Sequence, residues 1–186
     1  VGYGTKIGFV PMHSWLPDVY QGTNLASLAN LKIDNGATLA LTAASYLNLG
    51  GTLQNEGTLS GVSGSTITFA NSTAQAISGT GASTFGNLTL NNSGGLTLSD
   101  AGITINGTLD FQNGLLTTGA NTATIGSTGS ITNASSSNYV SGKLAQTFAN
   151  AGSKVFPIGK GGNYRPVTFN YTAVTGTSLV TAEQTE

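Results

Sequence analysis

The chain has 186 residues, enough for one domain or for one domain with a small appendage. Only 7% of the residues are charged and the formal net charge is −1, so the clustered Lys and Arg that binding to nucleic acid requires are missing. The absence of cysteine excludes disulfides and thiolate metal sites. The sequence also contains no run of about 20 apolar residues, the length that a helix needs to cross a bilayer. Regularly spaced Leu, Ile, Val and Phe among Thr, Ser, Asn and Gly indicate an ordered β protein.

Residues 1–22 are expected to form an apolar N-terminal arm. Val1 in place of a start methionine indicates a mature product or a fragment. The stretch "VGYGTKIGFVPMHSWLPD" (1–18) resembles a segment of the antiporter-like membrane subunits of NADH dehydrogenase and hydrogenase, where the matching Lys and His lie on a proton path. We do not transfer that role to Lys6 or His13, because the membrane context is missing. The arm is too apolar to stay in water and is expected to pack on the first coil of its own subunit or on a neighbour. Its assembly residues are Ile7, Phe9, Val10, Met12, Trp15 and Leu16.

Residues 23–148 contain an internal repeat. "NLKIDNGATLAL" (30–41) aligns with "NLTLNNSGGLTL" (87–98) at an offset of 57 residues. After a slip of one residue, "LNLGGTL" (47–53) aligns with "ITINGTL" (103–109). Repeats of this length are typical of stacked architectures.

The strands within each copy are short and alternate Leu or Ile with Thr, Asn or Lys, which places apolar residues on one side. Strands this short bury too little surface as separate hairpins, so the pattern predicts a β-solenoid, that is, a parallel β-helix. At about 18 to 20 residues per coil, the repeat would span three coils and residues 24–148 about six. An antiparallel β-sandwich is the alternative, since Asn-Gly pairs at 35–36, 106–107 and 113–114 are hairpin signals.

Residues 149–186 are predicted to form a small β element that caps the solenoid. From Tyr139 onward the strands become longer, Pro appears at their edges, and four of the six cationic residues gather. A cap is expected because an open coil exposes unpaired strand edges and an apolar cross-section. The four cations are Lys143, Lys154, Lys160 and Arg165.

The repeat, followed by "SSNYVSGKLAQTF" and "GSKVFPIGKGGNYRPVTFNYT", resembles large secreted surface proteins of Bacteroidetes- and Chlorobi-type bacteria. In those proteins Thr/Asn-rich β-helix repeats lead into a similar junction. The resemblance covers residues 30 to about 172. It implies secretion, an extracellular location at the bacterial cell surface and a surface or adhesive role, and it implies no catalytic residues.

The candidate catalytic groups are few. Asp100 and Asp110 could divide acid and base work in a polysaccharide-degrading enzyme. No cation lies near them, and each is expected to close a turn by bonding its own backbone. His13, Ser14 and Asp18 could be written as a Ser-His-Asp arrangement, but the stretch lacks the G-x-S-x-G motif of such a nucleophile. A zinc site is not expected either, because one His without any Cys cannot supply three protein ligands. We therefore predict no catalytic residue, no metal and no cofactor.

Two further patterns have structural explanations. "GKGGNYR" (159–165) lacks the spacing of a phosphate-binding loop and is expected to be a tight turn between strands. The T-x-T pairs at 66–68 and 122–124 would match an ice lattice only if such pairs shared one face in most coils. The preference of Thr for exposed strand positions explains them better.

The sequence thus predicts a non-enzymatic extracellular structural protein that assembles with copies of itself into a filament or matrix, through stacked coils and the N-terminal arm. The first alternative is a carbohydrate-binding or adhesin module that contacts surface polysaccharide through exposed aromatic residues. The polysaccharide-degrading enzyme is the second alternative. The glycan-contacting residues would be Tyr139, Tyr164 and Tyr171.

Overall fold

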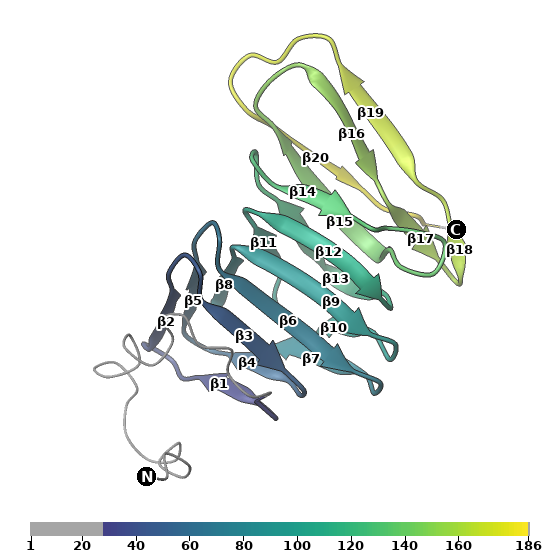
Figure 1. Cartoon of the computed structure of the whole chain (residues 1–186). Coiled ribbons are helices and arrows are strands. Elements are labelled where there is room, and N and C mark those ends of the chain that lie inside the picture. Colours follow the sequence, from purple (N-terminus) through teal and green to yellow (C-terminus); the bar gives the residue numbers. More distant parts are fainter. Residues whose placement is uncertain (1–27, 186) are drawn as a thin grey trace, which may run out of the picture.

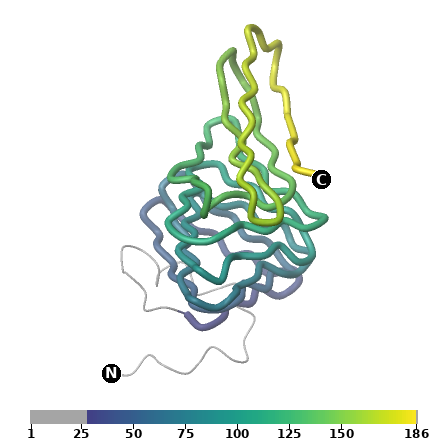
Figure 2. Tube along the Cα trace, turned by 90° about the vertical axis from the view of Figure 1, so that its right-hand side faces the viewer, coloured from purple at the N-terminus to yellow at the C-terminus, as the bar shows by residue number. Residues whose placement is uncertain are grey.

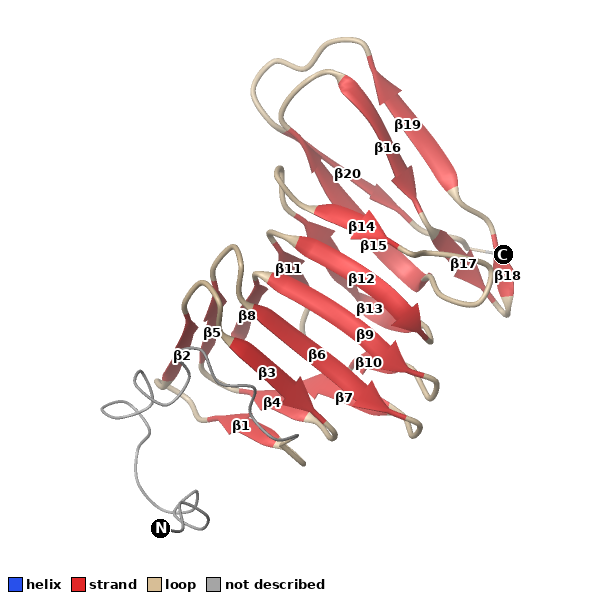
Figure 3. Ribbon diagram, in the orientation of Figure 1, coloured by secondary structure: helices blue, strands red, loops and turns tan. Residues whose placement is uncertain are grey.

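A computed structural model describes residues 28–185, and in this range the chain consists of strands and turns with no helix (Figures 1 and 3). The predicted arm at 1–22 therefore lies outside the described residues. No helix in residues 28–185 is long and apolar enough to span a membrane.

The strands wind into a β-solenoid with three faces (Figure 1). The first face contains β1 (Leu31–Ile33), β4 (Leu53–Asn55), β7 (Gln75–Ser78), β10 (Leu96–Leu98) and the first part of β13 (Leu116–Ile125). The second face contains β2 (Thr38–Leu41), β5 (Thr58–Gly61), β8 (Ala82–Phe85), β11 (Ile103–Ile105) and the last part of β13. The third face contains β3 (Tyr46–Leu49), β6 (Thr66–Asn71), β9 (Asn87–Asn92), β12 (Thr108–Asn113) and β14 (Ser130–Thr132).

All pairings among these strands are parallel, so the solenoid prediction is confirmed and the antiparallel sandwich is wrong. Along the first face Leu31 pairs with Leu53, Leu96 with Leu116, and Leu116 with Val140, which gives coils of 20 to 24 residues. The coils are longer than predicted because each contains three strands and three turns. About six coils are present, as predicted.

The 57-residue repeat does not correspond to three whole coils, so this prediction is wrong. Leu31 lies in β1 on the first face, whereas its match Leu88 lies in β9 on the third face. The same shift, by eight strands, relates Leu59 in β5 to Leu116 in β13. Strands on all three faces share one sequence pattern: every second residue is apolar and points inward, and a turn follows the strand. The repeat therefore advances by two and two-thirds coils.

Apolar side chains stack along the inside of the solenoid. On the third face Leu49, Phe69, Leu90 and Phe111 follow one another in register, each at most 1% exposed. Burial of a side chain of this size stabilises the fold by about 1.5–3 kcal/mol. The column thus joins coils that are about 20 residues apart in the sequence.

The last coil merges into the cap. This region contains β15 (Val140–Phe148), β16 (Gly152–Phe156), β17 (Ile158–Lys160), β18 (Asn163–Tyr164), β19 (Val167–Tyr171) and β20 (Ser178–Ala182). Strand β15 pairs in parallel with β13, whereas β20 lies antiparallel to β15 and β16 antiparallel to β19. Figure 2 shows this part of the chain extending beyond the solenoid. Strand β15, which ends at Phe148, pairs both with β13 of the solenoid and with β17 and β20 of the cap.

Candidate functional site

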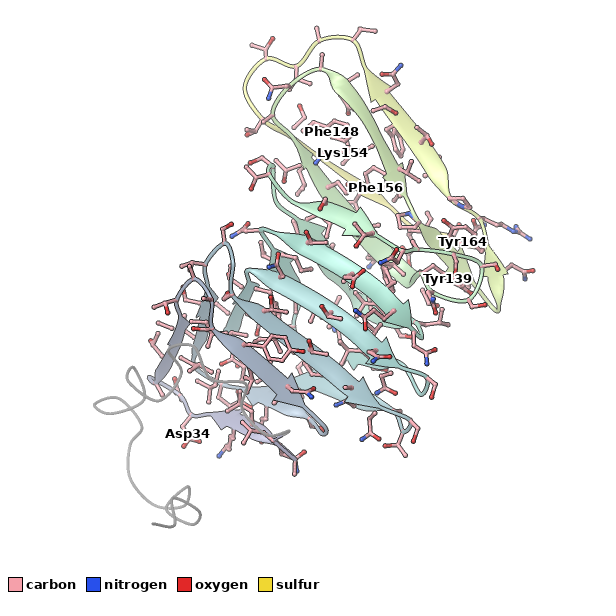
Figure 4. The ribbon with its side chains drawn as sticks, in the orientation of Figure 1. Asp34, Tyr139, Phe148, Lys154, Phe156 and Tyr164 are labelled. Atoms are coloured by element: carbon pink, nitrogen blue, oxygen red, sulfur yellow. The ribbon has the colours of Figure 1, made fainter. Side chains whose placement is uncertain are left out.

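Tyr139 is a core residue and not an exposed aromatic platform. Its side chain is 1% exposed, its ring centroid lies 5.5 Å from that of Tyr164, and the backbone of Gly159 passes so close that an added Cβ would lie 2.6 Å from the ring. Figure 4 shows both tyrosines beside the β17–β18 hairpin. The prediction that Tyr139 is exposed is wrong, because this hairpin folds over it.

Tyr171 lies in another part of the cap. It extends from β19, is half-buried, and its ring centroid is 4.6 Å from that of Phe148. Tyr164 is half-buried on β18. The three tyrosines therefore do not form one surface on which a sugar could stack.

Asp100 and Asp110 lie on different sides of the solenoid. Asp100 follows β10 and its Oδ2 accepts a hydrogen bond of 2.8 Å from the backbone N–H of Gly79, one coil earlier. Asp110 lies in β12 on the third face, where Oδ1 accepts from Thr132 Oγ1 at 2.8 Å and from Asn133 Nδ2 at 2.6 Å. The prediction that each Asp binds its own turn is wrong, since both link neighbouring coils. They also share no cleft, so this pair offers no acid–base arrangement.

The turns from the first to the second face carry three acids, which we call the acidic edge: Asp34, Glu56 and Asp100. Asp34 forms an ion pair of 2.7 Å with Lys32, which raises the pKa of Lys32. Glu56 Oε2 accepts from both the backbone N–H and the hydroxyl of Thr80, each at 3.2 Å. The Thr80 N–H is the main cause of the lowered pKa of the Glu56 carboxyl.

Apart from Lys32, the cations of the described residues lie at the other end. Lys143 Nζ donates to the carbonyl of Ala120 at 3.2 Å. Lys154 Nζ is buried, finds no hydrogen-bond acceptor among the described residues, and lies 5.6 Å from the ring centroid of Phe148. Its burial lowers the pKa of Lys154. Lys160 and Arg165 are exposed at the β17–β18 hairpin.

The "GKGGNYR" stretch forms this hairpin, with Gly161 and Gly162 at φ +60° and +82°, so the predicted turn is confirmed. The two T-x-T pairs lie on different faces, Thr66 and Thr68 in β6 and Thr122 and Thr124 in β13. No group of three His, Cys, Asp or Glu that could bind a metal occurs between residues 28 and 185. Of two shallow depressions, Lys154 is the one ionisable side chain that lines the first, of about 230 Å³, and the second, of about 240 Å³, is lined by no ionisable side chain.

A set of buried side-chain amides was not predicted from the sequence. Asn55 is fully buried, and its Nδ2 donates to Ala82 O and Ser83 Oγ, both at 2.9 Å. Its Oδ1 accepts from the N–H of Gly57 at 3.0 Å. Asn92 accepts in the same way from Gly94 at 2.7 Å. The Asn-x-Gly spacing in both places is the signal that could have identified these residues as turn amides.

Comparisons with protein-family models, with curated proteins and with solved structures found no match.

Proposed function

We propose that the chain is an extracellular structural protein rather than an enzyme, and that it assembles with copies of itself into a filament or matrix. The observation that carries the proposal is that the described residues leave strand edges unpaired at both ends of the molecule. Unpaired edges present free backbone donors and acceptors and are sites for strand addition.

At the N-terminal end, β1 pairs only with β4 and β2 only with β5 within residues 28–185. On the third face, Leu28 lies one coil below β3. Its backbone N–H donates to Asn48 O at 2.9 Å, and its carbonyl accepts from the N–H of Gly50 at 2.8 Å. This bridge is parallel and pairs Leu28 with Leu49. A further coil, from this chain or another, would continue the same geometry.

At the capped end, β19 pairs only with β16, and β20 only with β15, in the part of the chain that the structure describes. Each of these strands has five residues, long enough to accept an added strand. In the proposed assembly, the apolar arm of one copy adds to such an edge on the next copy. Burial of its large side chains would stabilise this contact.

The uncharged surface is compatible with close association. Along the second face the outward residues in register are Ala40, Ser60, Thr84, Thr104 and Thr124, none of which carries a charge. Charged residues, which commonly protect sheet edges from aggregation, are scarce in the whole chain. The extracellular location is part of the same proposal and is supported by the cysteine-free, Thr/Asn-rich composition.

Deletion of residues 1–20 tests the proposal. We expect the full chain to form oligomers or filaments in electron micrographs and in sedimentation velocity, and the truncated chain to sediment as a monomer. Circular dichroism would establish that the truncated chain keeps its β content. Unchanged filaments without the arm would contradict the role of the arm, and a monomeric full chain would contradict self-assembly.

A carbohydrate-binding module is the weaker candidate. With Tyr139 buried, two of the three predicted stacking residues remain, the half-buried Tyr164 and Tyr171, and they lie in different parts of the cap. A glycan array without a bound sugar would dismiss this role.

A further inference from the structure

The few charges of the described chain are separated by sign. Residues 28–138 contain four acids and one cation, a net charge of −3, whereas residues 139–185 contain four cations and one acid, a net charge of +3. The acids of the first part are Asp34, Glu56, Asp100 and Asp110, against Lys32, and the second part has Glu183 against its four cations. The solenoid body is therefore negative and the cap region positive.

The first acids of the acidic edge are also separated in space from the cations of the cap region. The acidic edge starts at Asp34 in the first coil, and Lys154 lies in the cap at the opposite end (Figure 4). Along the first face, β1 and β15 are separated by five steps between stacked strands, which correspond to roughly 24 Å. Electrostatic interactions in salt of physiological strength are screened over about 8 Å, so the two ends hardly neutralise each other within one molecule.

Both regions have exposed members. Asp34 and Asp100 are exposed and Glu56 is half-exposed along the acidic edge. At the capped end, Lys160 and Arg165 are both exposed within the short β17–β18 hairpin, which we call the cationic hairpin. Asp34 and Glu56, in the first two coils, and the cationic hairpin thus offer opposite charges at opposite ends, whereas Asp100 lies further along the solenoid, after β10.

We propose that copies of the chain associate head to tail, with the cationic hairpin of one copy against the acidic edge of the next. The inference deepens the proposed self-assembly, on which it rests, by naming the two surfaces that meet. The second copy is favoured as the occupant because the chain itself carries the complementary charges. Since the two surfaces differ, each association leaves one of each free, and the assembly propagates along a line. Such charge pairs fix the orientation and speed up the encounter of the partners.

Charge reversal in the full chain tests this pairing. The hairpin variant is Lys160→Glu/Arg165→Glu and the edge variant is Asp34→Lys/Glu56→Lys. Each is expected to weaken self-association about tenfold or more in sedimentation velocity, because like charges then face each other. An equimolar mixture of the two variants should associate again, and high salt should weaken the association of the wild-type chain. Glu183→Lys, an exposed charge reversal elsewhere in the cap region, should leave association unchanged.

The outcomes separate this pairing from self-assembly in general. If both variants associate like the wild type, the pairing is wrong while self-assembly stands. If only the hairpin variant loses self-association, and mixing it with the edge variant does not restore it, the pairing is again wrong. The hairpin then binds something other than the acidic edge, such as an acidic polymer. A wild-type chain that stays monomeric at low salt and high concentration removes the proposed function itself.

Discussion

The side-chain amide of Asn92 donates a hydrogen bond of 2.8 Å to the side-chain oxygen of Gln75, and both residues are buried where the third face turns into the first. The Gln75 amide in turn donates to Leu49 O at 2.9 Å and to Gly51 O at 2.8 Å, one coil below. Backbone carbonyls that leave the parallel ladder at this corner thus find donors from side chains. The corner is a chain of buried hydrogen bonds that connects successive coils.

Replacing Asn92 by Ala should therefore lower the free energy of unfolding by about 2–3 kcal/mol, because Gln75 Oε1 loses its partner in a buried site and the part-buried N–H of Gly94 loses its acceptor. Urea unfolding followed by circular dichroism measures this loss. Asn91→Ala is the matched control, since the Asn91 side chain is exposed, and it should change stability by at most about 0.5 kcal/mol. Equal losses in the two variants would contradict the importance of the buried amide.

Tyr139 provides a test of core packing against glycan contact. Tyr139→Ala should cost about 3 kcal/mol or more, because it leaves a cavity beneath the β17–β18 hairpin. Tyr139→Phe should be neutral or slightly stabilising, because the buried hydroxyl has no hydrogen-bond partner among the residues described. Thermal unfolding of the two variants distinguishes these effects. A large loss in Tyr139→Phe would mean that the hydroxyl is bonded after all.

Lys154 is expected to destabilise the cap in its charged form. Burial lowers the pKa of Lys154 in the folded chain from its ordinary value of 10.5. At pH values between this lowered pKa and the pKa in the unfolded chain, the folded chain therefore binds fewer protons than the unfolded chain. Stability should consequently rise as the pH rises through this window. Lys154→Met should remove that rise and slightly raise the urea midpoint at neutral pH, since an apolar side chain replaces a half-buried one whose ammonium has no hydrogen-bond acceptor among the described residues.

Urea midpoints measured from neutral to alkaline pH check the behaviour of Lys154. Lys160→Met, at an exposed position, serves as the control and should leave the pH dependence as it is in the wild type. A Lys154→Met chain that is less stable than the wild type at neutral pH would show that the contact of the ammonium with the Phe148 ring outweighs the cost of its burial.

The sequence was sufficient to predict the solenoid because its signals are local. Alternation such as Leu31-Lys32-Ile33 defines the buried side of a strand, and the absence of long strands favours stacked coils over hairpins. The face on which each strand lies could not be predicted, since strands of all three faces follow the same alternation. Leu31 and Leu88 align in sequence although they lie on different faces.

The candidate site was harder to predict because its contacts depend on coil length. Asp100 meets Gly79, which is 21 residues earlier in the sequence, so an error of a few residues per coil assigns it the wrong partner. Tyr139 becomes buried only because the hairpin of β17 and β18 folds over it. Neither event has a signature within a few residues of the side chain concerned.

Glu56 should make the solenoid sensitive to acid. Hydrogen bonds from Thr80 lower the folded-state pKa of Glu56 below 4.5, so its contribution to stability is present above that value and is lost as the pH falls through the lowered pKa. Glu56→Gln removes the ionisable group, and the difference in urea midpoint between wild type and variant should shrink as the pH falls from about 6 to about 3. Gln54→Ala removes the second donor to the Glu56 carboxyl, a contact of 3.4 Å, and should therefore give a smaller acid-dependent difference from the wild type than Glu56→Gln does. A wild-type–Glu56→Gln difference that stays constant over this range would mean that the carboxyl of Glu56 gains nothing from the turn at Thr80.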